Sequence, residues 1–270
     1  MKVKIPRALT IAGSDSSGGA GIQADLKTFS ALGVYAVSAV TALTSQNTLG
    51  VSGIVRIDPD FVSSQIRSVV LDIGVDAVKT GMLCNGAIIS RVCADVVELR
   101  IKNLVVDPVM ISSSGHRLLD EEAVETLATR LFPLALVVTP NVQEAHRLTG
   151  VRVECAEDMR RAAVELHRMG CRHVVLKGGH LQGNPMDLLY DGVKFREYPG
   201  IRQATVHTHG TGCTFAAAIA AFLARGATVE DAVGGAKTFV AAAIAQGLPL
   251  GKGVGPLHHF HQFYKFEQGA

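Results

Sequence analysis

The sequence predicts an α/β fold in which helices cover both faces of a mostly parallel central sheet, giving three layers (αβα). Short, continuous apolar runs of the kind found in buried parallel strands alternate with helical segments along the whole chain. Polar or glycine residues follow most of these runs, as they do at the carboxyl ends of strands in such sheets. Because no linker, repeat or low-complexity tract interrupts this pattern, we expect one domain over residues 1–270.

The first half of the chain starts with a strand, a glycine-rich loop and a helix. The strand covers Ala8–Ala12, the loop runs over Gly13–Gly21, and the helix extends from about Ile22 to Leu32. Apolar runs bounded by turn residues mark the later strands. The further elements expected here are the strand Val34–Thr44, the helix Asp58–Leu71, the strand Asp76–Lys79, the helix Ala87–Leu99 and the strand Leu104–Val106.

The second half continues the alternation and ends with two long helices. Asp187–Tyr190 and Lys194–Tyr198 predict a hairpin, because Asp191-Gly192 is a favoured two-residue turn. The Ala-rich run Phe215–Arg225 predicts a helix that stops at Gly226, and a capping-box pattern starts the last helix at Thr228. The other elements expected here are the helix Glu121–Leu131, the strand Leu134–Val138, the helices Glu144–Thr149 and Glu157–Met169, and the strand His173–Leu176.

The bulk composition argues against several classes of protein. A hydrophobic content of 48% supports a large core, while a net charge of +2, no Trp and 5% aromatic residues argue against nucleic acid and anionic membranes as partners. No window reaches the about 18 apolar residues of a spanning helix, and Ser14 and Asp15 break the N-terminal apolar run too early for a signal peptide. Five scattered cysteines without C-x-x-C or zinc spacing fit a reducing compartment, so we expect a cytoplasmic protein.

The glycine-rich opening loop is similar to two familiar nucleotide motifs but satisfies neither. Gly13 and Gly18 have the glycine spacing of a P-loop, but Gly19 stands where that motif needs Lys. A superficial dinucleotide fingerprint in the same loop lacks its acidic residue, because no Asp or Glu lies between Asp25 and Asp58. We therefore expect a ligand loop of another kind.

The segment His207–Thr214 leads into the N-terminus of the Ala-rich helix. Gly210 and Gly212 allow the backbone to turn sharply and to approach a bound group closely. The first N–H groups of a helix have no partners within it and carry the positive end of its dipole. The segment therefore predicts an anion-binding cradle with Cys213 at its rim, where the helix N-terminus favours the thiolate. The alternative is an ordinary loop ahead of a core helix, with Cys213 as a packed residue.

Polar or glycine residues stand at the ends of most expected strands. The carboxyl ends of parallel strands are where α/β sheets bind ligands, so these side chains are expected to converge. The residues concerned are Gly13, Gln46, Met82, Asp107, Asn141 with Glu144, and Lys177. Together with the cradle, they predict an enzyme that acts on a phosphate compound.

Two of these positions are candidate metal ligands, and a third is a candidate phosphate contact. Asp107 and Glu144 fit carboxylates that hold Mg²⁺ through water, because Mg²⁺ prefers oxygen ligands and retains waters. Asp107 also fits a simple turn before Pro108, and Asn141-x-x-Glu144 also fits a capping box. Lys177 is either a point charge on a phosphate or a surface lysine.

Other polar and sulfur-containing residues have equally open alternatives. Gln46 either reads the edge of a ring through its amide or is a plain loop residue. Met82 lines either a ligand or the core. The histidines at 258, 259 and 261 suggest zinc, but no carboxylate or Cys accompanies them, so a solvated tail is favoured.

Taken in order, these motifs resemble the hydroxymethylpyrimidine/phosphomethylpyrimidine kinases of thiamine biosynthesis. The resemblance covers nearly the whole chain and implies a ribokinase-like fold with a roughly eight-stranded sheet. The matching segments are Ala8–Thr28, Gln46-Asn47-Thr48, Lys79–Leu83, Asp107–Met110, Thr139–Glu144 and Thr208–Thr214.

The resemblance also implies where the ligands lie. ATP is expected along Lys177, Thr208 and the glycine cradle, and Mg²⁺ near Asp107 and Glu144. The aminopyrimidine substrate is expected to contact Gln46 and Asp25 by hydrogen bonds and Gly13, Ala20, Thr44, Met82 and Val109 by packing.

The same resemblance assigns the catalytic residues. Cys213 stands where most ribokinase-like sugar kinases carry an Asp base, and this branch resembles the exception that carries Cys. The cradle residues Gly210, Thr211 and Gly212 are expected to act with it.

The family phosphorylates the hydroxymethyl group and then the resulting monophosphate, and it is commonly dimeric and cytoplasmic. The resemblance therefore implies a thiamine-precursor kinase that acts as a homodimer. A pyridoxal/pyridoxine kinase is the nearest alternative, because a related branch shares the opening loop and the Gly-x-Gly-Cys segment. A non-catalytic pyrimidine-binding regulator is the other alternative, against which the intact Asp107, Glu144, Lys177 and Cys213 argue.

Overall fold

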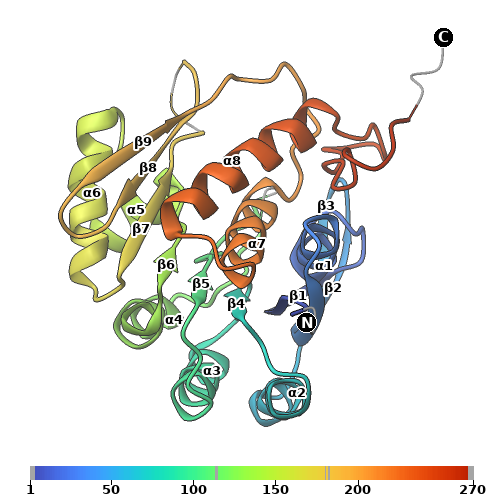
Figure 1. The fold of residues 1–270 in the computed structure, drawn as a ribbon, viewed down its shortest axis with the longest axis vertical. Coiled ribbons are helices and arrows are strands. Elements are labelled where there is room, and N and C mark those ends of the chain that lie inside the picture. Colours follow the sequence, from blue (N-terminus) through green and yellow to red (C-terminus); the bar gives the residue numbers. More distant parts are fainter. Residues whose placement is uncertain (1–3, 113–114, 180, 182, 267–270) are drawn as a thin grey trace.

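The structure is a computed structural model that describes residues 4–112, 115–179, 181 and 183–266. Helices cover both faces of a central sheet (Figure 1), so the predicted three-layer α/β fold is confirmed. The strands are β1 (Arg7–Asp15), β2 (Tyr35–Asn47), β3 (Gly50–Arg56), β4 (Ala77–Thr80), β5 (Leu104–Val106), β6 (Val137–Val138), β7 (His173–Lys177), β8 (Met186–Tyr190) and β9 (Phe195–Pro199).

The helical segments connect these strands and end the chain. They are α1 (Gly21–Ala31), α2 (Pro59–Asp72), α3 (Gly86–Glu98), α4 (Ala123–Thr126), the π-helical turn η1 (Leu127–Leu131), the 3₁₀ turn η2 (Phe132–Leu134), α5 (Val142–Thr149), α6 (Ala156–Arg168), α7 (Thr211–Ala224) and α8 (Val229–Ala245). No helix among the described residues is long and apolar enough to cross a membrane.

The strands form one sheet in the order β3-β2-β1-β4-β5-β6-β7-β8-β9. In this order, the six strands β2, β1, β4, β5, β6 and β7 run parallel to their neighbours. At one edge β3 pairs antiparallel with β2, and at the other β8 and β9 pair antiparallel. The six parallel strands therefore end at the same edge of the sheet, as the predicted convergence of their terminal residues requires.

Both faces of the parallel strands are buried. In β1, Ala8 packs on the side of α1, α7 and α8, while Leu9 and Ile11 pack on the side of α2 and α3. β5 follows the same rule, with Val105 on one side and Leu104 on the other. Successive side chains of a strand point to opposite faces, so a strand covered on both faces reads as a continuous apolar run.

Helix α7 is buried along almost its whole length between the sheet and α8. Its residues from Phe215 to Ala221 are at most 3% exposed. Small side chains allow this close approach. The ring of Phe222 packs directly on Gly235 of α8, where a Cβ would lie only 2.7 Å from the ring. α7 begins at Thr211 rather than at the expected Phe215, so residues 211–214 form its first turn.

The sequence-based prediction differs from the structure mainly at edges and turns. β3 is not among the expected strands, because nearly all its side chains are exposed and it lacks an apolar run. The strand expected over Leu134–Val138 covers only Val137–Val138, since Phe132–Leu134 form a 3₁₀ turn around Pro133. β2 extends beyond Thr44 to Asn47 to pair with β3.

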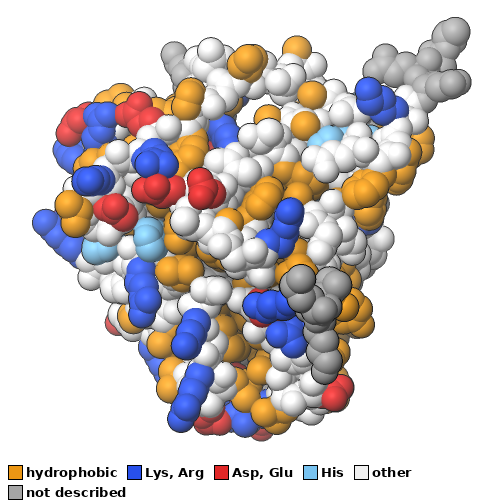
Figure 2. Space-filling model, in the orientation of Figure 1, with side chains coloured by type: hydrophobic (Ala, Val, Ile, Leu, Met, Phe, Trp, Pro, Cys, Tyr) orange, Lys and Arg blue, Asp and Glu red, His pale blue; other side chains and the backbone are white. Residues whose placement is uncertain are grey.

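Charged side chains of both signs gather on the outer surface of α6 and β9. Figure 2 shows blue and red side chains intermixed on this part of the molecule. Arg160 of α6 pairs with Glu157 and with Glu197 of β9.

The C-terminal histidines are buried, so the expectation of a solvated tail is wrong. His258, His259 and His261 are 3%, 3% and 7% exposed. His259 Nε2 lies 3.0 Å from Thr214 Oγ1 in the first turn of α7, and the ring of His261 packs against Phe239 of α8. The sequence lacks a long apolar run here, because imidazoles provide much of the buried surface.

The burial of His259 predicts that acid weakens the fold. Burial first, and then the nearby cations, lower the pKa of His259 to about 3, against about 6.5 in an unfolded chain. The unfolded state therefore binds one more proton between these values, and stability is lost as the pH falls below about 6.5.

We expect the wild-type protein to lose about 2 kcal/mol through this group between pH 6.5 and 5. His259→Gln should reduce that loss, as measured by urea unfolding at both pH values. His116→Gln, at an exposed position, is the matched control. An equal loss in wild type and His259→Gln would contradict the prediction.

Candidate functional site

Three segments far apart in the sequence meet at the carboxyl edge of the sheet. Lys177 ends β7, Asp107 follows β5, and Gly212 lies in the first turn of α7. Lys177 Nζ donates to Asp107 Oδ1 at 2.9 Å. A Cβ on Gly212 would lie 3.4 Å from Lys177 Nζ and 3.9 Å from Asp107 Oδ2. The predicted convergence is therefore present, with the helix N-terminus directly beside a partly buried cation and a buried carboxylate.

The cradle depends on a close contact between two backbone segments. Gly210 caps α7 with φ +85, and a Cβ there would lie 1.8 Å from the carbonyl oxygen of Gly19. Only glycine fits such an approach in this left-handed conformation. Thr211 Oγ1 donates to the carbonyl of Thr208 at 2.7 Å, which closes the turn before the helix.

Cys213 is partly exposed and lies among three charged groups. Lys79 favours the thiolate, while Asp25 and Asp107 oppose it, and the backbone of Gly21 hydrogen-bonds to the thiol. Burial has the largest effect, and the pKa of Cys213 rises to about 11. The expectation that the helix N-terminus favours the thiolate is therefore wrong for this state, because desolvation and the neighbouring carboxylates outweigh the dipole.

Beneath Cys213 lies an ion pair that is fully buried. Lys79 Nζ donates to Asp25 Oδ2 at 2.9 Å, and both side chains are 0% exposed. Thr10 Oγ1 donates to the same carboxylate at 2.6 Å. Although burial opposes the charge on Lys79, the carboxylate of Asp25 more than compensates and raises the pKa of that lysine. The structure thus gives Asp25, a candidate substrate contact, two protein partners.

Lys79 is a residue that the sequence reasoning missed as a member of the site. It interrupts the short apolar strand β4, whose four residues are all buried. A charged lysine in a buried strand requires a buried anion beside it. A lysine within a short apolar strand is therefore the sequence signal that could have indicated a buried carboxylate such as Asp25.

The candidate metal ligands Asp107 and Glu144 lie close together and share a cation. Lys177 bonds to Asp107, and it also interacts electrostatically with Glu144. Burial, aided by Asp107, raises the pKa of Glu144 to about 7, although Lys177 opposes this. The capping-box alternative is also present, because Glu144 Oε2 accepts from Asn141 N at 2.8 Å.

These carboxylates fit a water-mediated magnesium site. Mg²⁺ is commonly bound through one or two carboxylates with several waters retained. Burial is the main cause of the raised pKa of Glu144, and the neighbouring Asp107 adds to it, so a cation near both carboxylates would favour their ionised forms. Among the described residues, no group of three or more His, Cys, Asp and Glu side chains is arranged to hold a metal directly.

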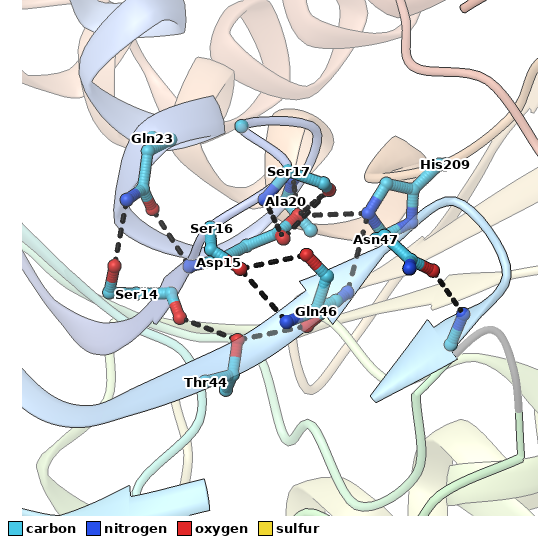
Figure 3. A network of polar contacts seen from close by, with 12 residues as sticks. Ser14, Asp15, Ser16, Ser17, Ala20, Gln23, Thr44, Gln46, Asn47 and His209 are labelled. Atoms are coloured by element: carbon cyan, nitrogen blue, oxygen red, sulfur yellow. Dashed lines mark hydrogen bonds and ion pairs between the residues drawn. The ribbon is translucent and has the colours of Figure 1, made fainter. Parts of the chain in front are cut away.

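The residues expected to contact a pyrimidine lie around the opening loop. A Cβ on the buried Gly13 would lie 3.0 Å from Met82 Sδ, so this glycine and this thioether are in contact. Figure 3 shows Thr44, Gln46 and Ala20 around the same loop. Thr44 Oγ1 donates to the carbonyl of Ser14 at 2.9 Å.

Two other features complete the geometry around these residues. Val109 is half-buried, and its N–H donates to the carbonyl of Asp107 at 2.8 Å. A cavity of about 380 Å³ begins at Met82 and extends along Ile54 and Arg56 of β3. A second cavity of about 580 Å³ lies over α2 and α3 and contains none of the candidate residues.

His209 connects the two parts of the site and is the other residue that sequence reasoning missed. Its Nε2 lies 2.9 Å from Asp15 Oδ2 and 3.4 Å from Gln46 Nε2 (Figure 3). It directly precedes Gly210, so the cradle and the opening loop share this contact. The only signal in the sequence is its position within the cradle segment.

A sequence model of the phosphomethylpyrimidine kinase family matches residues 15–258. The chain belongs to the phosphomethylpyrimidine kinase family. The resemblance inferred from the motifs is therefore confirmed.

Members of the phosphomethylpyrimidine kinase family are similar over nearly the whole chain. The hydroxymethylpyrimidine/phosphomethylpyrimidine kinase of Streptomyces coelicolor is 50% identical over 254 residues, covering 94% of each chain. The thiamine biosynthesis bifunctional protein ThiED of Geobacter sulfurreducens is 53% identical over 252 residues. That match covers 93% of this chain and 51% of the relative, so the chain spans about half the length of the bifunctional protein.

Solved structures include both substrate branches. Phosphomethylpyrimidine kinase from Clostridium difficile has a TM-score of 0.80 and 44% identity, covering 89% of this chain and 100% of that one. The ADP complex of Bacillus subtilis pyridoxal kinase has a TM-score of 0.89 and 42% identity, covering 96% and 99%. These likenesses confirm the ribokinase-like fold.

The buried Lys79–Asp25 pair predicts an asymmetric effect on stability. Asp25→Ala should lower the free energy of unfolding by about 3–5 kcal/mol, because it leaves a buried ammonium without its counter-charge. Asp25→Leu combined with Lys79→Met removes both charges and should recover most of that loss, as measured by urea unfolding. Glu165→Ala, which breaks an exposed pair with Arg168, should cost less than about 1 kcal/mol. Equal losses in the single and double variants would contradict the prediction.

Proposed function

We propose that this chain transfers phosphate from ATP to 4-amino-5-hydroxymethyl-2-methylpyrimidine and then to the resulting monophosphate, in thiamine biosynthesis. One observation carries the proposal: the N-terminus of α7, with Cys213, lies beside Lys177 and Asp107 at the strand ends. This arrangement suits phosphoryl transfer, which depends on positioning and on stabilising charge. Relatives named for both phosphorylations are about half identical to the chain.

The nucleotide is assigned to the cradle side of the site. Gly212 places no Cβ between the first turn of α7 and Lys177, so phosphate oxygens could approach the backbone there. Gly210 holds this turn against the carbonyl of Gly19, and Thr208 and Thr211 shape the turn. Lys177 would then exchange its contact with Asp107 for one with a phosphate. A neighbouring structure, the pyridoxal kinase of Staphylococcus aureus, is described in complex with AMP-PCP, an ATP analogue.

Mg²⁺ is assigned to Asp107 and Glu144 through water molecules. When bound there, the ion would neutralise charge on the phosphates and help to orient them. The two carboxylates are buried side by side, and each keeps a second role in the fold. Asp107 accepts from Thr139 Oγ1 at 3.2 Å, and Glu144 holds the start of α5.

Cys213 is assigned as the general base for the first phosphorylation. Its thiolate would accept the proton of the hydroxymethyl group, and the nearby Lys79 ammonium favours that thiolate. The monophosphate attacks with an oxygen that is already ionised, so the second step needs the base less.

The pyrimidine ring is assigned to the opening-loop side, against Gly13, Met82 and Val109. The amide of Gln46 has a donor and an acceptor, and an aminopyrimidine offers the complementary pair in its ring nitrogen and amino group. Ala20 and Thr44 lie near Gln46 (Figure 3) and are assigned to the same side of the site. Asp25 contributes by holding Lys79, and its direct contact with the substrate stays a prediction.

Pyridoxal is the second candidate substrate, because pyridoxal kinases from Bacillus subtilis and Staphylococcus aureus have TM-scores of 0.89 with this chain. Pyridoxal lacks the amino group beside a ring nitrogen, so it cannot satisfy both ends of the Gln46 amide. The homodimer, the single domain over 1–270 and the cytoplasmic location stay predictions.

The assignment of Cys213 makes the first phosphorylation sensitive to pH. Well below a pKa of about 11, the thiolate fraction rises about tenfold for each pH unit. We expect kcat/KM for hydroxymethylpyrimidine to rise from pH 7 to 9 and Cys213→Ala to lower it about 100-fold or more. The same variant should lower kcat/KM for the second phosphorylation much less. ADP release with each pyrimidine measures both steps, with the exposed Cys155→Ala as control. Equal losses of kcat/KM in the two phosphorylations would rule out Cys213 as the general base.

The assignment of Gln46 predicts substrate choice and tests the proposed function. Wild-type protein should use hydroxymethylpyrimidine efficiently and pyridoxal weakly, since unpaired buried polar groups cost binding energy. Gln46→Met should reduce the difference between the two kcat/KM values, mainly by weakening the binding of hydroxymethylpyrimidine. The ratio of kcat/KM values for the two substrates measures the effect, and product mass identifies each phosphate ester. A wild-type preference for pyridoxal would sink the proposal.

A further inference from the structure

Asp15 and His209 form a buried contact between segments 194 residues apart. Their side chains are only 3% and 7% exposed. Figure 3 shows the His209 ring between the opening loop that carries Asp15 and the end of β2 that carries Gln46. Nothing in the proposed phosphoryl transfer uses this pair.

The partners of Asp15 determine which nitrogen of His209 carries a proton. Asp15 accepts hydrogen bonds from the N–H groups of Ser17 and Ala20, both at 2.8 Å, and from the hydroxyl of Ser17. Although burial opposes ionisation, these bonds and that of His209 lower the pKa of Asp15 to about 2. An ionised carboxylate only accepts hydrogen bonds, so the Nε2 of His209 must carry a proton and donate it to Asp15 Oδ2.

That proton constrains the Gln46 carboxamide, which contacts His209 at one end and Thr44 at the other. The amide nitrogen lies 3.4 Å from His209 Nε2, a contact drawn in Figure 3, so two donors face each other. The amide oxygen lies 3.3 Å from Thr44 Oγ1, whose single proton goes to the Ser14 carbonyl at 2.9 Å, so two acceptors face each other.

A half-turn of the amide removes both conflicts. The two ends of a carboxamide have nearly the same shape, so the partners decide which end is oxygen. After the half-turn, Gln46 Oε1 accepts from His209 Nε2–H, which Asp15 shares, and Gln46 Nε2 donates to Thr44 Oγ1. One N–H and one lone pair of the amide then stay available to a ligand.

We propose that His209, held by Asp15, is a positioning residue that fixes the orientation of the Gln46 amide and so determines specificity for an aminopyrimidine. The inference rests on the proposed function, because it gives Gln46 the task of reading the ring. Without the imidazole donor, only Thr44 Oγ1 distinguishes the two ends of the amide. The amide is then held less firmly, and some of the molecules lose the pattern that complements the ring nitrogen and amino group.

The surrounding backbone is built to hold this imidazole. A Cβ on Gly19 would lie 2.3 Å from His209 Cδ2, so the ring lies directly on a glycine. The main chain of Gln46 is also fixed, because its N–H donates to Ser16 Oγ at 2.8 Å and its carbonyl accepts from Ser16 Oγ at 2.7 Å. The rotation of the side-chain amide is thus the freedom that His209 removes.

The test uses two variants that differ in reach. His209→Gln places an amide N–H near the position of the imidazole Nε2–H, while the shorter His209→Asn cannot reach it. We expect His209→Asn to raise KM for hydroxymethylpyrimidine about tenfold, with KM for ATP within about twofold of wild type, and His209→Gln to restore most of the loss. For a 5-hydroxymethylpyrimidine without the amino group, His209→Asn should leave KM unchanged.

Two further variants complete the design. His207→Gln, in the same segment but without contact to Asp15 or Gln46, controls for disturbance of the loop. Gln46→Met with His209→Asn should be no worse than Gln46→Met alone, because His209 acts through Gln46. Thermal unfolding of each variant checks that the fold is retained.

The outcomes separate the inference from the proposed function. If Gln46→Met leaves KM for the aminopyrimidine unchanged, the proposed reading of the ring fails, and the inference fails with it. If Gln46→Met raises KM but His209→Asn raises KM equally for both pyrimidines, or adds fully to Gln46→Met, only the inference is overturned. The same holds if His209→Gln fails to rescue a folded protein.

Discussion

The structure depends on how closely the first turn of α7 approaches the ends of the parallel strands and the opening loop. Gly210 lies against the carbonyl of Gly19, and Gly212 lies against Lys177 and Asp107. A Cβ at Gly210 would collide with that carbonyl and push α7 away, while a Cβ at Gly212 would lie in ordinary contact with Lys177 and Asp107. The Ala-rich sequence of α7 meets the same requirement along its length, because small residues let the helix pack deeply on the sheet.

Buried charges at this edge are arranged as pairs that join distant segments. Lys79 joins β4 to α1 through Asp25, Lys177 joins β7 to the end of β5, and His209 joins the cradle to the opening loop. Such pairs contribute little net stability, because desolvation offsets their attraction. Their effect is to position side chains. Each pair keeps a polar group at a place where an apolar contact would provide no hydrogen-bonding or charged atom. The three pairs therefore fix the relative positions of the strand ends, the cradle and the opening loop.

The sequence was sufficient to predict features that local rules determine. Strands buried on both faces read as apolar runs, and Asp107 and Lys177 follow such runs, so their meeting could be expected. Features that depend on tertiary contacts could not be. β3 carries no apolar run, His259 is buried only because α7 provides a partner, and the roles of Lys79 and His209 depend on carboxylates 54 and 194 residues away. Asp25 was expected to bond to a substrate, and that contact stays a prediction; its buried partner Lys79 could not be inferred from local sequence.

The pKa of Cys213 shows how magnitudes decide between competing local rules. A helix N-terminus favours an anion by about 0.3–1 kcal/mol at exposed sites. A rise in the pKa from the ordinary value of 9.0 to about 11 corresponds to roughly 3 kcal/mol against the thiolate, so burial outweighs the dipole. The group that works against burial is the Lys79 ammonium, which exists as a cation in an apolar strand only because Asp25 lies beside it. The basicity of the thiol is therefore controlled mainly by burial, which the Lys79 ammonium partly offsets, and less by the helix that carries the residue.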